Sequence, residues 1–172
     1  SQRSKALDTP EHVDRQIMEV DYFGPVKLTK AVLPRMISQG GGHILCTSSI
    51  VGVFGFPLRS SYSAAKHAMH GFFESIRAEY YDNGIKVGIV IGGRINTPIS
   101  MSALTSDGTP YGKMDDGQNN GISPEKAARQ ILKGVRRNKR EIRCGGKELI
   151  MVNLKRWLQG LHFRLSRAVK PT

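Results

Sequence analysis

The sequence predicts an α/β protein in which helices cover a parallel sheet. Amphipathic helical patterns alternate with short apolar runs along the chain, and this order is typical of parallel strands joined by right-handed crossovers. The apolar runs are nearly continuous, as expected of strands buried on both faces. The predicted order is helix, strand, helix, strand, helix, strand, helix.

Each element has a local signal. The helical patterns cover residues 10–37, 60–81, 123–135 and 147–169, and the strand-like runs cover residues 43–48, 85–91 and 141–144. Thr9-Pro10-Glu11 and Ser123-Pro124-Glu125 each place an N-cap hydroxyl, a proline and an acid at a helix start. Pro25 indicates a bend or a fresh first turn. Residues 98–122 are expected to form a functional or mobile loop without regular structure.

The composition is that of a globular protein from a reducing compartment. The 172 residues suffice for one domain with a core. No apolar run approaches the ~20 residues that span a bilayer, and the chain opens on polar residues rather than a secretory signal. Cys46 and Cys144 lie far apart, and the histidines have no metal-ligand spacing. We therefore expect a cytoplasmic protein with free thiols and no metal site.

The positive charge is concentrated near the C-terminus. The formal net charge is +12, and residues 123–172 hold 14 Lys and Arg against 3 Asp and Glu. A basic amphipathic helix at 147–172 fits the surface of an anionic membrane, to which the protein would then be peripheral through residues 150–170. The preferred alternative is that Leu154, Trp157, Leu158 and Leu161 pack on the domain or a second subunit. No nucleic-acid reader motif accompanies the charge, so we expect no nucleic-acid partner.

Tyr62 and Lys66 form the strongest candidate for chemistry. They lie four residues apart in the 60–81 helix and therefore project from one face. An ammonium beside a phenol lowers the phenol pKa from about 10 towards neutrality, which is what a general acid/base requires. The alternative is an incidental pair on a surface helix. Two other polar segments, at Ser49 and at 92–97, follow strands, at the sheet edge where α/β proteins bind ligands.

Taken together in this order, the motifs resemble the short-chain dehydrogenase/reductase family. That family carries a serine thirteen residues before the tyrosine of a Tyr-x-x-x-Lys motif, and Ser49 stands thirteen residues before Tyr62. The segment 48–52 resembles the family's Ser-Ser-x-x-Gly, and the segment 92–97 resembles its Pro-Gly-x-Ile-x-Thr with Gly92 in place of proline. The resemblance implies a Rossmann-like doubly wound parallel sheet. Residues 1–146 would form its second half, about three strands with flanking helices.

The resemblance also implies a function. The protein would be an oxidoreductase that uses NAD or NADP to interconvert an alcohol and a ketone or aldehyde on a lipophilic small molecule. Tyr62 would exchange the proton, Lys66 would lower the Tyr62 pKa and hold the nicotinamide ribose, and Ser49 would donate a hydrogen bond to the substrate oxygen. The turn containing Gly93, Ile95 and Thr97 would hold the nicotinamide carboxamide. A homodimer or homotetramer, paired through helices near 22–37 and 62–81, is implied as well.

The sequence departs from the family pattern in two important ways. Asp21 stands where the family has an asparagine that helps hold a water beside the lysine, and its carboxylate would partly neutralise Lys66. The sequence also contains neither the Gly-rich phosphate turn nor Asn-Asn-Ala-Gly. We therefore expect a truncated, inactive fragment with an unpaired sheet edge. The alternative is a catalytically inactive interaction or membrane-surface protein built on the same fold.

Overall fold

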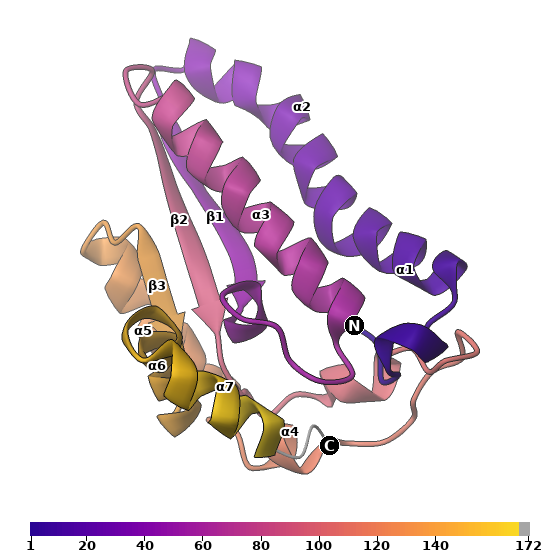
Figure 1. Ribbon diagram of the computed structural model, residues 1–172. Coiled ribbons are helices and arrows are strands. Elements are labelled where there is room, and N and C mark those ends of the chain that lie inside the picture. The colour runs from indigo at the N-terminus through magenta and orange to yellow at the C-terminus, as the bar shows by residue number, and fades with distance from the viewer. Residues whose placement is uncertain (169–172) are drawn as a thin grey trace.

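A three-stranded parallel sheet forms the centre of the computed structural model, which describes residues 1–168 (Figure 1). The strands are β1 (Gly42–Ser49), β2 (Ile85–Gly92) and β3 (Glu141–Cys144), in the spatial order β1-β2-β3. The register pairs Ser49 with Gly92 and Gly92 with Cys144, so all three strands end at the same level. The predicted parallel α/β architecture is confirmed.

Helices cover both faces of this sheet. The helices are α1 (Glu11–Met18), α2 (Gly24–Ser38), α3 (Ser60–Glu79), α4 (Asp116–Asn119), α5 (Pro124–Arg136), α6 (Ile150–Trp157) and α7 (Gln159–Ala168). Phe73 and Met69 of α3 pack on Ile89 and its strand neighbours in the main core. Val90, the next residue of β2, points to the other face and packs with residues of β3 and α5. Successive residues of one strand thus serve two helix layers.

The first helical segment runs continuously from Glu11 to Ser38, where a bend or a fresh first turn was expected at Pro25. Residues Glu19–Phe23 form a π-helical turn that joins α1 to α2 without a break. Its wide turn is closed by the Gly24 amide, which donates to the Glu19 carbonyl. Pro25, in the first turn of α2, has no N–H to donate, which is a usual reason for such a local widening. Asp21 lies within this turn.

Two other expectations are corrected. The single helix expected at 147–169 is a 3₁₀ turn (Lys147–Leu149) followed by α6 and α7, because Leu158 between them has non-helical dihedral angles (φ −133°, ψ 60°). The last expected helical residue, Val169, lies outside the described residues. The segment 98–122 contains a 3₁₀ helix (Pro98–Ser102) and α4, so it is not irregular throughout.

The sheet has an unpaired edge among the described residues. β1 pairs with β2 on one side only, and Leu45 in its middle is exposed. None of the helices within residues 1–168 is long and apolar enough to cross a membrane. The cytoplasmic location stays a prediction.

Candidate active site

A cleft of about 1250 Å³ opens where the strands end. Ser49 and Tyr62 contribute to its lining together with Gly93, Ile95 and Thr97. The common level of the strand ends produces this juxtaposition, since Ser49 closes β1 and Gly92 closes β2. Five of the seven predicted site residues therefore meet in one cavity. The other two, Lys66 and Asp21, lie outside its lining and contact each other.

Tyr62 occupies the first turn of α3 and is held by a residue that sequence reasoning missed. The Tyr62 amide donates to Oε1 of Gln2 over 3.2 Å, and the Gln2 amide group donates to the hydroxyls of Ser60 and Ser61. The Gln2 side chain is fully buried. Arg59, the N-cap residue of α3, makes no side-chain cap hydrogen bond. Gln2, from a distant part of the chain, instead accepts the hydrogen bond of a free backbone amide in the first turn of α3. No local pattern in the sequence signals such a cap.

Lys66 lies one turn further along α3 and is buried. Its Nζ lies 5.5 Å from the centre of the Tyr62 ring, and 3.0 Å from Oδ1 of Asp21. The Thr47 carbonyl accepts a longer hydrogen bond from the same nitrogen, at 3.4 Å. The ammonium is thus adjacent to the phenol as predicted from the spacing, but a carboxylate shares it.

The pKa of Tyr62 differs from the expectation. Burial is the largest influence and raises the pKa above its ordinary value. The Lys66 charge lowers it, in the expected direction, but the Asp21 carboxylate raises it again. A hydrogen bond with the Ser49 side chain also lowers the pKa. The net effect raises the pKa of Tyr62, so the prediction that this pKa falls towards neutrality is wrong. The reason is that the Lys66 charge does not outweigh burial and the Asp21 carboxylate.

Ser49 and its neighbour Ser48 have different surroundings. Ser49 contacts Tyr62 as described and accepts a long hydrogen bond from the Val51 amide, at 3.4 Å, which caps the short 3₁₀ turn Ile50–Gly52. Ser48 is buried, and its Oγ lies 2.8 Å from Nε2 of His70 on α3. The alternation of side chains along β1 gives Ser48 this structural partner and leaves Ser49 beside the tyrosine.

The turn after β2 is held by Glu148, a second residue that sequence reasoning missed. Its Oε1 accepts hydrogen bonds from the amides of Arg94, at 2.7 Å, and Gly146, at 2.9 Å. A Cβ on Gly93 would lie 2.2 Å from the same oxygen, so glycine is required for the carboxylate to come this close. Pairs of glycines stand at the ends of two strands, Gly92-Gly93 at β2 and Gly145-Gly146 after β3. Such pairs indicate a close approach of the backbone to another group, but they do not indicate that the group is Glu148.

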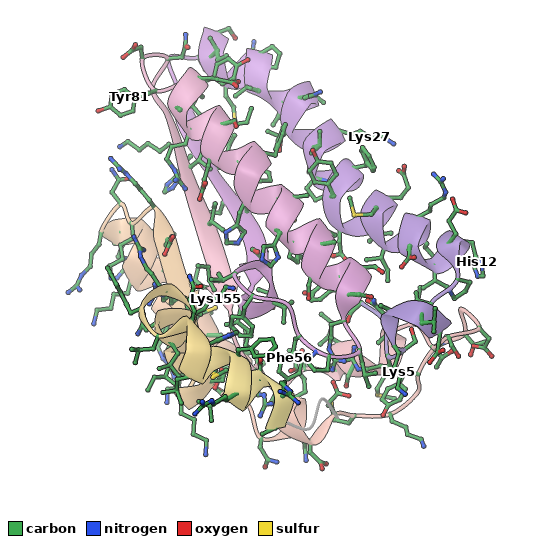
Figure 2. The ribbon with its side chains drawn as sticks, in the orientation of Figure 1. Lys5, His12, Lys27, Phe56, Tyr81 and Lys155 are labelled. Carbon is green, nitrogen blue, oxygen red and sulfur yellow. The ribbon has the colours of Figure 1, made fainter. Side chains whose placement is uncertain are left out.

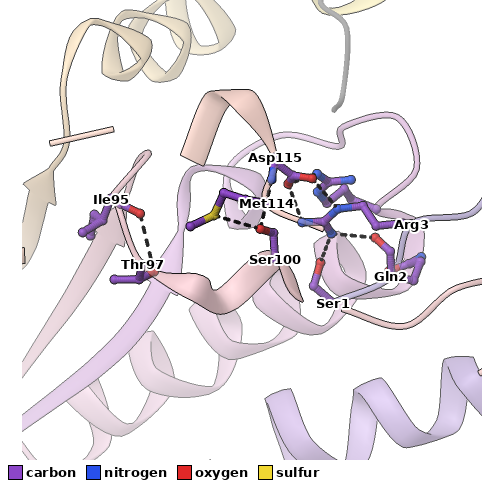
Figure 3. Close-up of polar contacts among 9 residues, drawn as sticks. Ser1, Gln2, Arg3, Ile95, Thr97, Ser100, Met114 and Asp115 are labelled. Carbon is purple, nitrogen blue, oxygen red and sulfur yellow. Dashed lines mark hydrogen bonds and ion pairs between the residues drawn. The ribbon is translucent and has the colours of Figure 1, made fainter. Parts of the chain in front are cut away.

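Ile95 lies in a short bridge to Ile122. That bridge uses the Arg94 carbonyl and the Asn96 amide, so it leaves the Ile95 amide outside the pairing. The Thr97 hydroxyl donates to the Ile95 carbonyl over 3.5 Å (Figure 3). Ile95 and Thr97 both line the cleft, and the bridge does not use the Ile95 amide.

The segment after this turn is anchored by a buried carboxylate. Asp115 accepts hydrogen bonds from Arg3, at 2.6 Å, and Arg59, at 3.0 Å, and its amide donates to the Ser100 hydroxyl (Figure 3). Burial and the neighbouring Arg3 charge lower the pKa of Arg59 to about 10. The expected mobile lid is therefore tied both to the N-terminal segment and to the start of α3.

No group of three or more His, Cys, Asp or Glu side chains is arranged to hold a metal ion in the part of the chain that the structure describes. Both cysteines are buried free thiols, and burial raises the pKa of Cys46 to about 12. A reactive thiolate would need the opposite shift. Near Ser49 and Tyr62 the cleft offers a hydroxyl and a phenol for proton transfer.

The parallel sheet and the arrangement of the cleft define a Rossmann-like dehydrogenase fold, and comparison with known proteins agrees. Residues 1–107 match the family model described as "short chain dehydrogenase". The chain belongs to the short-chain dehydrogenase/reductase family, a family of oxidoreductases.

Similar proteins include two vertebrate members of this family. The chain is 42% identical to dehydrogenase/reductase SDR family member 7B of Bos taurus, over 99% of this chain and 53% of that protein. Its identity with the Danio rerio protein of the same name is 40%, over 100% of this chain and 57% of the other. The chain thus spans a little more than half the length of these curated relatives.

Solved structures show the same fold. A short-chain dehydrogenase from Burkholderia cenocepacia, in complex with NADP, superposes with a TM-score of 0.70 at 29% identity, over 88% of this chain and 58% of that one. A short-chain dehydrogenase from Streptomyces avermitilis gives a TM-score of 0.76 at 28% identity, over 97% of this chain and 65% of the other.

Proposed function

We propose that this cleft catalyses the interconversion of an alcohol and a ketone or aldehyde, with Tyr62 as general acid/base. The observation that carries the proposal is that Ser49 and Tyr62 share one cavity with the 93–97 turn. In the oxidation direction, the Tyr62 phenolate accepts the substrate hydroxyl proton while Ser49 donates a hydrogen bond to the same oxygen. Lys66 acts from behind Tyr62, where its charge favours the phenolate.

The residues present suit the nicotinamide end of NAD or NADP. Ile95 and Thr97 line a cleft whose volume exceeds that of a usual small-ligand pocket, and their backbone amide and hydroxyl are groups that can bind a carboxamide. The NADP complex of the Burkholderia relative supports this cofactor class. The bound nicotinamide would supply or accept the hydride. The ribose contact that the resemblance implies for Lys66 stays a prediction, because Nζ is buried against Asp21.

A lipophilic substrate fits the rest of the lining. Large apolar side chains from three separate parts of the chain surround the cavity, namely Val51, Phe54, Phe56, Ile99, Ile150 and Met151. Apolar walls with a few polar groups are typical of sites that bind small organic molecules. The substrate oxygen would lie between Ser49 and Tyr62, with its apolar part against these residues.

The test is Tyr62→Phe in the complete protein that carries these residues. Loss of the proton-transfer group should lower kcat by about 10²- to 10⁴-fold. Tyr81→Phe is the matched control, because Tyr81 is exposed in the turn after α3, and it should leave kcat unchanged. Turnover of Tyr62→Phe within a few-fold of the parent would refute the proposed role.

We further propose that the 172 residues by themselves are inactive. They contain no Gly-rich turn for the pyrophosphate, which normally binds such a turn at a helix N-terminus. Isothermal titration calorimetry of the isolated chain with NADH and NADPH tests this expectation. Binding at micromolar affinity would contradict it.

One observation favours a second candidate function. The Asp21 carboxylate pairs with Lys66 and opposes the lowering of the Tyr62 pKa by that lysine. Such opposition is expected of a catalytically inactive protein that keeps the fold for interactions. The Tyr62→Phe comparison separates the two candidates. If the complete protein turns over no alcohol or carbonyl substrate and Tyr62→Phe keeps its folding and partners, the inactive alternative is favoured.

A homodimer or homotetramer is proposed for the complete protein. Residues of α2 and the π turn leave large apolar side chains exposed, among them Val20, Phe23, Leu28 and Val32. Exposed apolar groups on adjoining helical turns are typical of an oligomer interface. Leu28→Glu should shift the sedimentation coefficient towards the monomer, and an unchanged coefficient would argue against this interface.

A further inference from the structure

The last two helices leave their largest apolar side chains uncovered. The exposed fractions are 74% for Trp157, 63% for Phe163, 60% for Ile150 and 54% for Leu158. Leu161 and Leu165 are exposed as well. Among residues 1–168 this is a dense group of apolar residues at the surface, and groups of this kind mark interaction sites. The preferred expectation was that Leu154, Trp157, Leu158 and Leu161 pack on the domain or on a second subunit. Packing on the domain is wrong for Trp157, Leu158 and Leu161, which are exposed, and packing on a second subunit stays a prediction.

Few contacts hold these helices on the domain. α6 is anchored by Val152, which is buried in the main core. α7 is anchored by His162, whose ring packs against Phe54 with 4.8 Å between centroids. Met151 also packs against the main core, and Asn153 accepts a hydrogen bond from Arg143. The exposed apolar side chains take no part in these contacts, so they are available to a partner.

The same surface is strongly basic. Five Lys and Arg residues lie between 147 and 168, namely Lys147, Lys155, Arg156, Arg164 and Arg167. The acidic residue of this segment, Glu148, directs its carboxylate inward to the Arg94 and Gly146 amides. Cations and aromatic rings share one surface, since Arg156 lies 5.4 Å from the Trp157 ring centre and Arg167 lies 5.8 Å from that of Phe163.

We propose that α6 and α7 form a docking surface for an anionic lipid bilayer, called here the C-terminal surface. The combination of Trp, Phe and Leu with Arg and Lys, and with little acid, complements a membrane interface: the apolar groups enter the acyl boundary and the cations meet the headgroups. Trp is favoured at that depth. A polyanion such as nucleic acid would use the arginines but leave the apolar side chains in water.

The position of the C-terminal surface also supports a bilayer as its partner. α6 and α7 lie at the end of the molecule where the strands terminate (Figure 1), and Ile150 and Met151 of α6 also line the cleft. Phe56, from the loop after β1, lies at the same end (Figure 2). A docked bilayer would therefore adjoin the apolar mouth of the cavity. The inference goes beyond the proposed function, because binding to a membrane requires no turnover.

The experiment is co-sedimentation of the full chain with phosphatidylcholine vesicles, with and without phosphatidylserine. We expect binding that requires phosphatidylserine and weakens as salt is raised. Trp157→Ser combined with Phe163→Ser should lower the partition coefficient by about tenfold or more, because the two rings that would enter the bilayer are removed. Arg164→Glu combined with Arg167→Glu should lower it similarly by reversing charge.

Matched controls lie elsewhere on the surface. Arg136→Glu with Arg137→Glu makes the same charge change at two exposed residues at the end of α5. Tyr81→Ser with Leu132→Ser removes two exposed apolar groups that belong to neither α6 nor α7, and Tyr81 lies at the opposite end of the molecule from Lys155 (Figure 2). Both controls should bind vesicles as the parent does, and circular dichroism should show equal helix content in all variants.

Three results would overturn the proposal. The first is an absence of vesicle binding by the parent chain. The second is an equal loss of binding in the control variants, which would mean that net charge or hydrophobicity alone decides. The third is self-association of the chain without vesicles, measured by sedimentation velocity, in a protein that does not bind vesicles. Trp157→Ser with Phe163→Ser would have to abolish this self-association. That result would assign the C-terminal surface to a second copy of the chain.

Discussion

The carboxylate of Asp21 lies 3.0 Å from the ammonium of Lys66, and both side chains are largely withdrawn from solvent. The π-helical turn Glu19–Phe23 carries Asp21, and α3 carries Lys66 one turn after Tyr62. A carboxylate at this position opposes the effect of the lysine on the tyrosine. The balance between burial, Lys66, Asp21 and Ser49 sets the Tyr62 pKa, and each influence can be tested separately.

Replacing Asp21 by asparagine should lower the pKa of Tyr62. The substitution keeps an oxygen acceptor near Lys66 but removes the negative charge that disfavours the phenolate. The Tyr62 titration is obtained from tyrosinate absorbance, as the difference between each protein and the same protein carrying Tyr62→Phe. Glu19→Gln removes a charge from the same turn at an exposed site that pairs with Lys27, and it should leave the titration in place. An upward shift in Asp21→Asn would contradict this account.

Ser49→Ala should move the same titration in the opposite direction. The Ser49 side chain lowers the Tyr62 pKa through its hydrogen bond, so its removal should raise that pKa further. In the complete protein, loss of this donor to the substrate oxygen should lower kcat by about 10²-fold or more. Ser48→Ala is the control, since Ser48 binds His70 instead. It should alter stability more than it alters the tyrosine titration.

Asp115→Ala should destabilise the protein strongly. The carboxylate is buried and shared by Arg3 and Arg59, so its removal leaves two guanidinium charges facing one another. Breaking a buried ion pair from one side typically lowers the free energy of unfolding by about 3–5 kcal/mol. Urea denaturation measures the change. Asp82→Ala, at an exposed turn, should stay within about 0.5 kcal/mol of the parent. A small effect of Asp115→Ala would show that the 98–122 segment is held by other contacts.

Glu148→Ala should loosen the turn that leads to Ile95 and Thr97. Two backbone amides lose a charged acceptor, which should lower the free energy of unfolding by about 1–3 kcal/mol. Glu148→Gln keeps an oxygen acceptor and should lose less. Hydrogen exchange of the Arg94 amide measures the local effect directly, with Glu141→Ala, which affects an exposed pair with Arg143, as control. An Arg94 amide that stays equally protected in Glu148→Ala would show that the carboxylate does not hold the turn.

The docking of α7 should depend on pH through His162. Burial lowers the pKa of this imidazole below its ordinary value, and the Lys155 charge lowers it further. The docked state therefore favours the neutral ring, so docking is fully stable above about pH 6.5 and weakens as the pH falls below it. Trp157 is the only tryptophan and lies just before α7, so its fluorescence reports the change. His162→Phe should abolish the transition near this pH, and an unchanged midpoint in that variant would assign it to another group.

The order of the elements follows from local properties of the sequence. Continuous apolar runs bounded by glycine, proline-led helix starts and a helical face along α3 depend only on residues near one another in the chain. The position of Tyr62 and Lys66 on one face, and of Ser49 at a strand end, follows from the same local periods. These patterns were enough to predict the parallel sheet, and the resemblance of the motifs at Ser49, Tyr62, Lys66 and 92–97 indicated the family.

The tertiary structure determined the partners, burial and pKa of those residues. Gln2 and Glu148 reach the site from more than fifty residues away, so no local pattern could assign them. The Tyr62 pKa depends on burial and on the distance between Asp21 and Lys66, both of which are set by packing between α3 and the π turn. The sequence determined which groups are present at the site and in what order, because chain spacing controls local geometry. Only folding determined their charges and partners, because those depend on contacts between distant segments.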